Sequence, residues 1–157
     1  MVAVKVRHST AGVLAPPPLI YAGALGVGLL LHRWHSVRLL PARFAAPAGI
    51  ALLLLGLTAV PALLAFRRVN TSPEPWKPTT ALVTTGPYRV TRNPMYLGFT
   101  LLYLGTTCWV NTLWPLILLP LVLVAMHYGV IIREETYLER LFGEEYLAYK
   151  RRVRRWL

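Results

Sequence analysis

Four apolar segments, each close to the length that crosses a bilayer, strongly constrain the fold of this chain. They lie at residues 19–40, 45–66, 95–110 and 113–132. A helix needs ~20 apolar residues to cross the hydrocarbon core of a membrane. With 55% hydrophobic residues, the chain is also too apolar for an ordinary soluble domain of 157 residues. We predict an all-α integral membrane bundle of about four transmembrane helices, followed by a C-terminal amphipathic helix.

The connections between these segments divide the chain into three parts. Residues 1–16 are expected to be a flexible leader, and residues 17–66 to form two N-terminal transmembrane helices. Residues 67–157 would then hold the functional core. The third and fourth segments are separated only by Asn111 and Thr112, so their helices are expected to form a tight antiparallel hairpin.

Basic residues are concentrated on one predicted side of the membrane. The formal net charge is +11, and 14 of the 17 Lys and Arg residues fall in the leader, in the 67–92 connection or after residue 132. The positive-inside rule makes this side cytosolic. Every acidic residue falls there as well. We therefore expect the site on the cytosolic face of an inner or plasma membrane.

Composition also limits the partners and metals of this protein. The basic residues lie in short segments between apolar runs, where anionic lipid headgroups are the expected counter-charge and nucleic acid is not. The single cysteine, Cys108, allows no internal disulfide and no cysteine-rich metal site. No metal is expected. The sequence leaves the oligomeric state open.

The tail after residue 133 has the pattern of an amphipathic helix. Tyr146, Tyr149, Val153 and Trp156 recur at spacings of three and four, and five basic residues occupy the other face. Such a helix suits the headgroup layer of a membrane. The same apolar stripe would equally pack against the protein's own loop.

Two polar segments flank the predicted hairpin. Residues 86–98 precede it, and an Arg-Glu-Glu run at 133–135 follows it. Because antiparallel helices begin and end on the same side, both segments should meet at one mouth. Glu134 is suited there to accept hydrogen bonds from hydroxyl or ammonium groups, and Tyr88 and Tyr96 offer ring faces to a flat or cationic group. We expect a small-molecule site at this mouth.

Four blocks of sequence carry a resemblance to a known family. They are residues 82–88 (LVTTGPY), 92–98 (RNPMYLG), 134–138 (EETYL) and 142–153 (FGEEYLAYKRRV). In this order, with the hairpin between the second and third, they resemble the isoprenylcysteine carboxyl methyltransferases and the related phospholipid N-methyltransferases. The resemblance runs from Thr80 onward. The first two apolar segments are similar to the family only as hydrophobic spans.

The resemblance implies an S-adenosyl-L-methionine-dependent methyltransferase. Its acceptor would be lipid-like or isoprenoid-like, a carboxylate or an amine, and would enter from the bilayer. Arg92 or Arg133 would orient this acceptor, and Glu135 or a tyrosine would be the base for an amine. Where eukaryotic members carry Arg-His-Pro, this chain has an asparagine. The implied cofactor site consists of Leu82, Val83, Gly86, Tyr88, Asn93, Pro94, Met95, Tyr96 and Glu134.

Two other classes of protein remain open on the sequence. Sterol-type membrane reductases that use NADPH also have a C-terminal helical hairpin and a basic tail. A non-catalytic module would use the basic tail only to gather anionic lipid. Taken singly, the polar residues also have structural explanations, such as a solvated helix start for Glu134 and Glu135 or lipid phosphate binding for Arg92.

Overall fold

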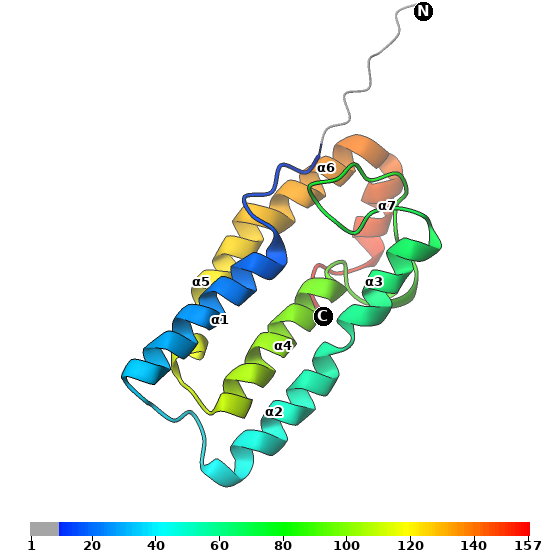
Figure 1. The fold of residues 1–157 in the computed structure, drawn as a ribbon. Coiled ribbons are helices and arrows are strands. Elements are labelled where there is room, and N and C mark those ends of the chain that lie inside the picture. The colour runs from blue at the N-terminus through cyan, green and yellow to red at the C-terminus, as the bar shows by residue number, and fades with distance from the viewer. Residues whose placement is uncertain (1–9) are drawn as a thin grey trace, which may run out of the picture.

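The structure is a computed structural model, and it describes residues 10–157. These residues form helices and loops without a strand, so the all-α prediction is confirmed for them. Figure 1 shows the long helices side by side, with a compact cap of shorter elements at one end. The elements are α1 (Pro17–Trp34), α2 (Ala42–Gly56), α3 (Ala59–Arg68), the 3-10 turn η1 (Gly86–Arg89), α4 (Pro94–Val110), α5 (Trp114–Met126), the π-helical turn η2 (His127–Ile131), α6 (Ile132–Phe142) and α7 (Glu144–Arg152).

The predicted short connection joins α4 to α5, but the two helices are not each other's main partners. Helix α4 packs mainly against α2, and α5 against α1. The turn is closed by Asn111, which has φ of 55° and therefore ends α4 in the left-handed conformation that asparagine tolerates. Its side-chain oxygen accepts the backbone N–H groups of Leu39 and Leu40 at 3.0 and 2.8 Å. The asparagine thus ties this turn to the α1–α2 connection.

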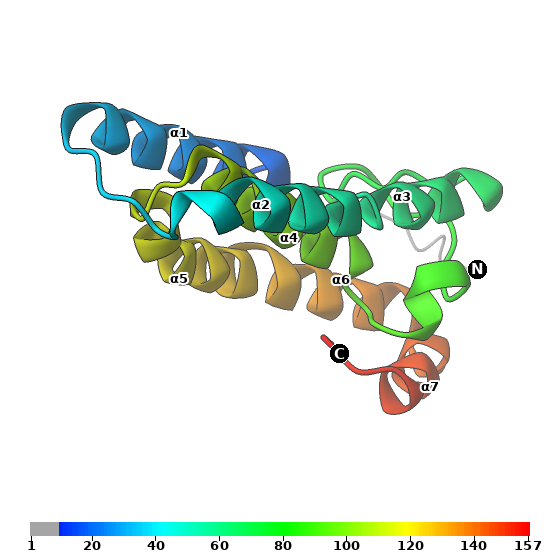
Figure 2. The same ribbon diagram turned by 90° about the horizontal axis from the view of Figure 1, so that it is seen from below.

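A break between α2 and α3 follows from a proline. Pro61 has no N–H to donate to the carbonyl of Leu57, four residues earlier, so the regular helical ladder cannot pass this point. Tighter bonds of the 3-10 kind replace it, including Thr58 N to Leu55 O at 3.1 Å. Figure 2 shows α2 and α3 as one nearly continuous rod with this irregularity in the middle. The far end of α3 reaches the cap.

Glycines allow α4 to approach α2 and α3 closely. A Cβ atom added at Gly49 would lie 2.6 Å from the backbone nitrogen of Trp109, and one at Gly98 would lie 2.6 Å from the Cβ of Ala59. Gly56 and Gly105 are equally crowded by Leu102 and Leu53. Small residues at a helix contact are the usual device for close packing inside a membrane.

Replacing Gly49 with alanine is expected to destabilise the bundle, because the new methyl group would meet backbone atoms that cannot rotate away. Overpacking of this kind costs about 1–3 kcal/mol. Thermal unfolding in detergent measures the loss. Gly26→Ala is the matched control, since a Cβ at Gly26 meets nothing within 4 Å. Equal melting temperatures for the two variants would contradict the packing described above.

Two continuous helices are long and apolar enough to cross a membrane, Ala42–Arg68 and Trp114–Phe142. Helices α1 and α4 have 18 and 17 residues, about 27 and 26 Å at ~1.5 Å per residue, slightly less than the ~30 Å of a hydrocarbon core. Large apolar side chains on the outer surface, such as Leu30, Leu54 and Leu121, are 63–70% exposed. The chain is a helical membrane protein, and its span count of four stays a prediction.

The tail packs on the protein rather than standing apart from it. Gly143, with φ of 51°, separates α6 from α7 at the position where the sequence pattern breaks. Tyr146, Tyr149 and Val153 are buried with Ala62 of α3 and other residues in a small apolar core. The predicted stripe therefore covers the protein's own α3 and loop. Beyond Arg152 the chain is extended, and Trp156 leaves this cluster to pack against the main apolar core.

Residues 10–16 of the expected leader are attached to the fold, while residues 1–9 lie outside the described part of the chain. The backbone N–H of Leu14 donates to Gly129 O in the π-helical turn at 2.9 Å, and that of Ala11 donates to Pro75 O at 3.2 Å. A π-helical turn displaces the regular hydrogen-bond ladder. The segment crosses the cap beside the cavity described next.

Candidate active site

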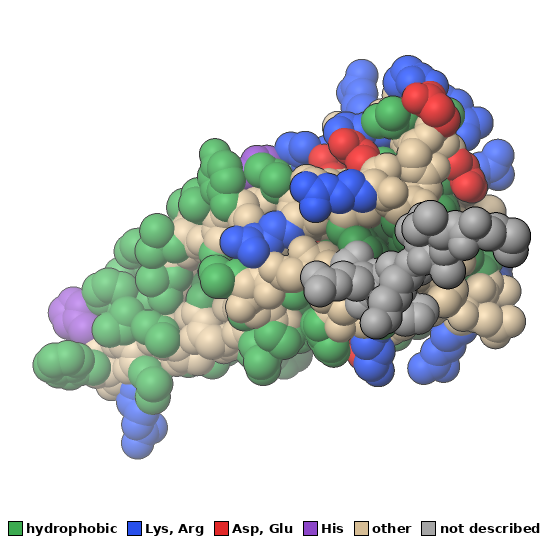
Figure 3. All heavy atoms as spheres, turned by 90° about the horizontal axis from the view of Figure 1, so that it is seen from above, with side chains coloured by type: hydrophobic (Ala, Val, Ile, Leu, Met, Phe, Trp, Pro, Cys, Tyr) green, Lys and Arg blue, Asp and Glu red, His purple; other side chains and the backbone are tan. Residues whose placement is uncertain are grey.

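A cavity opens in the cap of the bundle, the end that holds α3, η1, α6 and α7. It contains about 740 Å³ of space, its open mouth included. Charged side chains gather at this end of the molecule in Figure 3, whereas apolar ones cover most of the remaining surface in that view. The cavity is lined by Ala11, Phe66, Ser72, Pro73, Glu74, Pro75, Thr79, Ala81, Leu82, Val83, Tyr88, Arg92, Asn93, Met95, Tyr96, Glu134, Tyr137, Leu138, Tyr146 and Tyr149.

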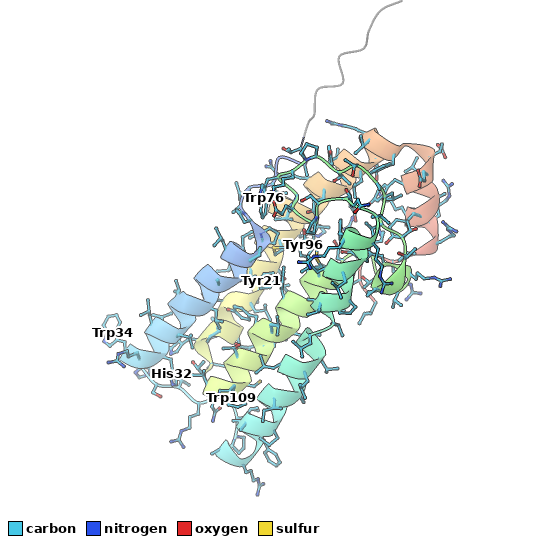
Figure 4. The ribbon with its side chains drawn as sticks, turned by 45° about the vertical axis from the view of Figure 1, so that its right-hand side comes forward. Tyr21, His32, Trp34, Trp76, Tyr96 and Trp109 are labelled. Atoms are coloured by element: carbon cyan, nitrogen blue, oxygen red, sulfur yellow. The ribbon has the colours of Figure 1, made fainter. Side chains whose placement is uncertain are left out.

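Glu134 supplies a carboxylate to one wall of the cavity. It lies in α6 and accepts a hydrogen bond from the Tyr96 hydroxyl, in the first turn of α4, at 2.6 Å. The two predicted polar segments therefore meet. Figure 4 shows Tyr96 toward the cap end of the bundle, away from Trp34 and Trp109 at the other end. Within the described residues, no Lys or Arg forms an ion pair with Glu134, so its carboxyl group keeps capacity to bind a ligand.

Arg92 supplies the opposite charge. It lies in the loop between η1 and α4, and its side chain is only 9% exposed. Its Nη1 lies 3.2 Å from Glu135 Oε1, but neither Nη1 nor Nε has a hydrogen-bond partner of suitable geometry among the described residues. A buried guanidinium N–H without a partner is costly. The arrangement fits an anionic group of a bound ligand in the cavity.

Glu135 lies outside the cavity lining and at the centre of an ion cluster. Arg155 donates to both of its carboxylate oxygens at 2.9 and 2.8 Å, the paired geometry that guanidinium and carboxylate groups favour. This hydrogen bond raises the pKa of Arg155. Lys150 lies 3.9 Å from Glu135 and also pairs with Glu139. Three cations and two carboxylates leave this cluster one positive charge in excess.

Three tyrosines around the cavity stay protonated. Burial raises the pKa of Tyr146 to about 12, with the neighbouring Glu135 adding to the effect. Burial likewise raises the pKa of Tyr88, where Glu134 adds to it, and the pKa of Tyr149. The Tyr149 hydroxyl donates to the backbone carbonyl of Tyr88 at 2.7 Å. These phenols are donors and aromatic walls rather than bases at neutral pH.

The loop before η1 forms the far wall of the cavity. It is held to the helices by side chains, since Thr80 N donates to Thr71 Oγ1 at 2.9 Å and Thr79 N to the Tyr137 hydroxyl at 3.1 Å. Leu82 and Val83 follow in the same loop and line the cavity. An irregular backbone stretch of this kind presents N–H and C=O groups that no helix uses.

Most of the residues expected from the sequence come together here. Seven of the nine cofactor-site candidates line the cavity, namely Leu82, Val83, Tyr88, Asn93, Met95, Tyr96 and Glu134. Gly86 and Pro94 do not line it, although each adjoins the cavity segments along the chain. Arg133 points elsewhere, because its Nη1 donates to Gly12 O at 2.8 Å. The roles expected for Arg92, Arg133 and Glu135 in handling an acceptor stay predictions.

Several lining residues escaped the sequence analysis. Tyr137 lies in a quoted block but had no role, and Tyr146 and Tyr149 were interpreted only as an apolar stripe. The sequence did contain a signal for these tyrosines, since large aromatic residues bearing a polar group are unusual in a purely apolar core. Nothing in the sequence pointed to Ala11 or to residues 72–75.

A second hollow lies on the outer side of the bundle, between α4 and α5. This lateral groove has about 930 Å³ of space, its open side included. Its walls are mostly apolar, with the polar groups of Thr100 and His127 among them. Trp156 closes one wall and also packs against the main apolar core. The full lining is Leu97, Thr100, Leu123, Val124, His127, Tyr128 and Trp156.

Comparisons with known proteins agree with this membrane site. The model of the phospholipid methyltransferase family matches residues 44–145, more than half of the chain. An uncharacterised protein of Haemophilus influenzae is 48% identical over 64 residues, which are 40% of this chain and all of that protein. The protein-S-isoprenylcysteine O-methyltransferase of Schizosaccharomyces pombe is 38% identical over 72 residues, 46% of this chain and 30% of the yeast protein. None of the solved structures matches the chain.

Fold, site and comparisons together define a membrane methyltransferase. The chain belongs to the phospholipid methyltransferase family. The resemblance noted in the sequence is thereby confirmed, and a methyltransferase is favoured over a sterol-type reductase.

Proposed function

We propose that the cavity in the cap binds S-adenosyl-L-methionine and that the enzyme methylates a lipid-like acceptor at the cytosolic membrane face. One observation carries this proposal: Glu134 and Arg92, two charges with unused binding capacity, lie in the walls of the same cavity. The amino-acid end of the cofactor bears an ammonium and a carboxylate. The two side chains complement these groups in sign.

The residues of the cavity fit the rest of the cofactor as well. Glu134 accepts hydrogen bonds from the ammonium group or the ribose, and the Tyr96 hydroxyl orients the carboxylate of Glu134. The Arg92 guanidinium, which lines the cavity, offers charged donors to the cofactor's carboxylate. Tyr88 and Met95, with Leu82 from the loop, offer apolar surface to the adenine ring. The bound cofactor supplies an electrophilic methyl group on a positively charged sulfur.

The lateral groove supports a lipid-like acceptor. It is mostly apolar and opens on the outer side of the bundle, where a membrane would lie. A hydrocarbon chain in the groove would hold its head group near the cap without leaving the bilayer. The basic residues around the cap, including Arg151, Arg152 and Arg154, would face anionic lipid headgroups on the cytosolic side.

The protonation of the cavity residues favours a carboxylate as the accepting group. Glu135 lies outside the cavity lining, where Arg155 and Arg92 hold its carboxylate, so it does not face an acceptor in the cavity. Burial keeps Tyr88, Tyr146 and Tyr149 protonated. A carboxylate is already a nucleophile at neutral pH, and the enzyme needs only to align it and exclude water.

Incubation of the purified enzyme with membrane lipids and a methyl donor carrying deuterium tests this proposal. We expect a lipid fraction that gains the labelled methyl group, detected by mass spectrometry. Mild alkali should release the label as volatile deuterated methanol, because methyl esters are hydrolysed, whereas a methyl group on nitrogen stays on the head group. A label that stays on a non-volatile head group after alkali would show an amine acceptor and overturn the carboxylate assignment. Absence of binding of S-adenosylhomocysteine in calorimetry would overturn the cofactor assignment itself.

A further inference from the structure

The segment after α7 runs beside the loop that carries Arg92. We call this segment, residues 153–156, the strap. The backbone N–H of Arg92 donates to Arg154 O at 2.9 Å. The side-chain amide of Asn93 donates to the backbone carbonyl of Arg155 at 3.0 Å. Two residues of the cavity wall are thus attached directly to the backbone of the strap.

A second connection runs through Glu135. Only 7% of this residue is exposed, and both of its carboxylate oxygens accept hydrogen bonds from the Arg155 guanidinium. Arg92 lies at 3.2 Å from one of the same oxygens but without the alignment of a hydrogen bond. Arg155 takes the paired hydrogen bonds of Glu135, while the Nε and Nη1 groups of Arg92 have no hydrogen-bond partner among the described residues.

We propose that Arg155 is a positioning residue, which keeps Arg92 available to the ligand's carboxylate by occupying Glu135 and by holding the loop through its backbone carbonyl. The inference rests on the proposed function. Arg155 is not among the residues that line the cavity. Its side chain acts through Glu135 on Arg92, and its backbone carbonyl holds Asn93. It is therefore distinct from the residues that touch the ligand.

The physical consequence of losing Arg155 follows from the geometry of the cluster. Glu135 would be left with Arg92 and the more distant Lys150, at 3.9 Å. The carboxylate would then turn to form a full hydrogen-bonded pair with Arg92, as buried charges must be compensated. Arg92 would be drawn away from the ligand. The loss should fall on the carboxylate end of the ligand and spare the nucleoside end.

Two ligands distinguish an effect on the carboxylate end from an effect on the nucleoside end. S-adenosylhomocysteine carries the amino-acid group, whereas 5′-methylthioadenosine has the same nucleoside and sulfur without it. For Arg155→Gln in the full chain in detergent, calorimetry should show about a tenfold weaker affinity for S-adenosylhomocysteine, the size expected for one charge-assisted hydrogen bond. Affinity for 5′-methylthioadenosine should stay within twofold of wild type. Arg155→Lys should recover part of the loss.

Controls distinguish positioning from general damage. Arg154→Gln alters the exposed neighbouring side chain of the strap and leaves its backbone carbonyl in place, so binding should be unchanged. In an Arg92→Gln background, Arg155→Gln should cause no further loss, because Arg155 acts through Arg92. Melting temperatures identify a variant that has lost its fold, in which case Arg155→Lys provides the measurement.

Two results would overturn the inference. Equal weakening of both ligands in Arg155→Gln or Arg155→Lys would assign the strap a purely structural role. Additive losses in the double variant would mean that Arg155 does not act through Arg92. Wild-type protein that binds neither ligand would instead overturn the proposed function, and the positioning role with it.

Discussion

Glu134→Ala is expected to abolish measurable binding of S-adenosylhomocysteine, and Glu134→Gln to weaken it by about 10- to 100-fold. The glutamine keeps an acceptor for the Tyr96 hydroxyl, which donates to Glu134 at 2.6 Å, but loses the charge. Hydrogen bonds to charged groups contribute about 1.5–3 kcal/mol. Alanine removes the acceptor as well and leaves a buried hydroxyl unpaired. Calorimetry on the purified variants measures both effects.

The matched control for this prediction is Glu145→Gln. Glu145 is an exposed carboxylate at the same end of the molecule, and it forms no ion pair with the described residues. The substitution changes the net charge of the cap by the same amount. Equal losses in the two variants would indicate a general electrostatic effect, and normal affinity in Glu134→Ala would refute the assignment of Glu134 to the cofactor.

Arg92→Gln is expected to weaken binding of S-adenosylhomocysteine by about 10- to 100-fold, since it removes the charged donors that the cavity offers to a carboxylate. Binding of 5′-methylthioadenosine, which lacks that carboxylate, should change little. The fold should survive, because Glu135 keeps its paired hydrogen bonds with Arg155. The melting temperature and the two dissociation constants test these three statements.

Arg89→Gln provides the comparison for Arg92. Arg89 lies three residues earlier, at the end of η1, is exposed, and does not line the cavity, so its loss should leave both affinities unchanged. If Arg92→Gln instead left cofactor binding intact and raised KM for the lipid acceptor, Arg92 would hold the acceptor, which is the role expected for it from the sequence. That result would also remove the basis for the positioning role of Arg155.

The sequence by itself determined the helices and the end of the molecule at which the site lies. The short connection at Asn111 and Thr112 forces α4 and α5 to be antiparallel, so the polar segments on either side of them must converge. The bond between Tyr96 and Glu134 is the result. These properties follow from helix length, turn length and apolar periodicity, which depend only on residues close together in the sequence.

Only the tertiary structure decided which of two adjacent glutamates faces the cavity. Successive residues point about 100° apart around a helix, and the π-helical turn His127–Ile131 just before them shifts that direction further. Local patterns therefore do not orient the pair. The sequence analysis gave both residues a role at the site, Glu134 on the cofactor and Glu135 on an acceptor. The structure directs Glu134 into the cavity and Glu135 toward Arg155, 20 residues further along the chain. Long-range contacts of this kind depend on how helices pack, and no local pattern encodes them.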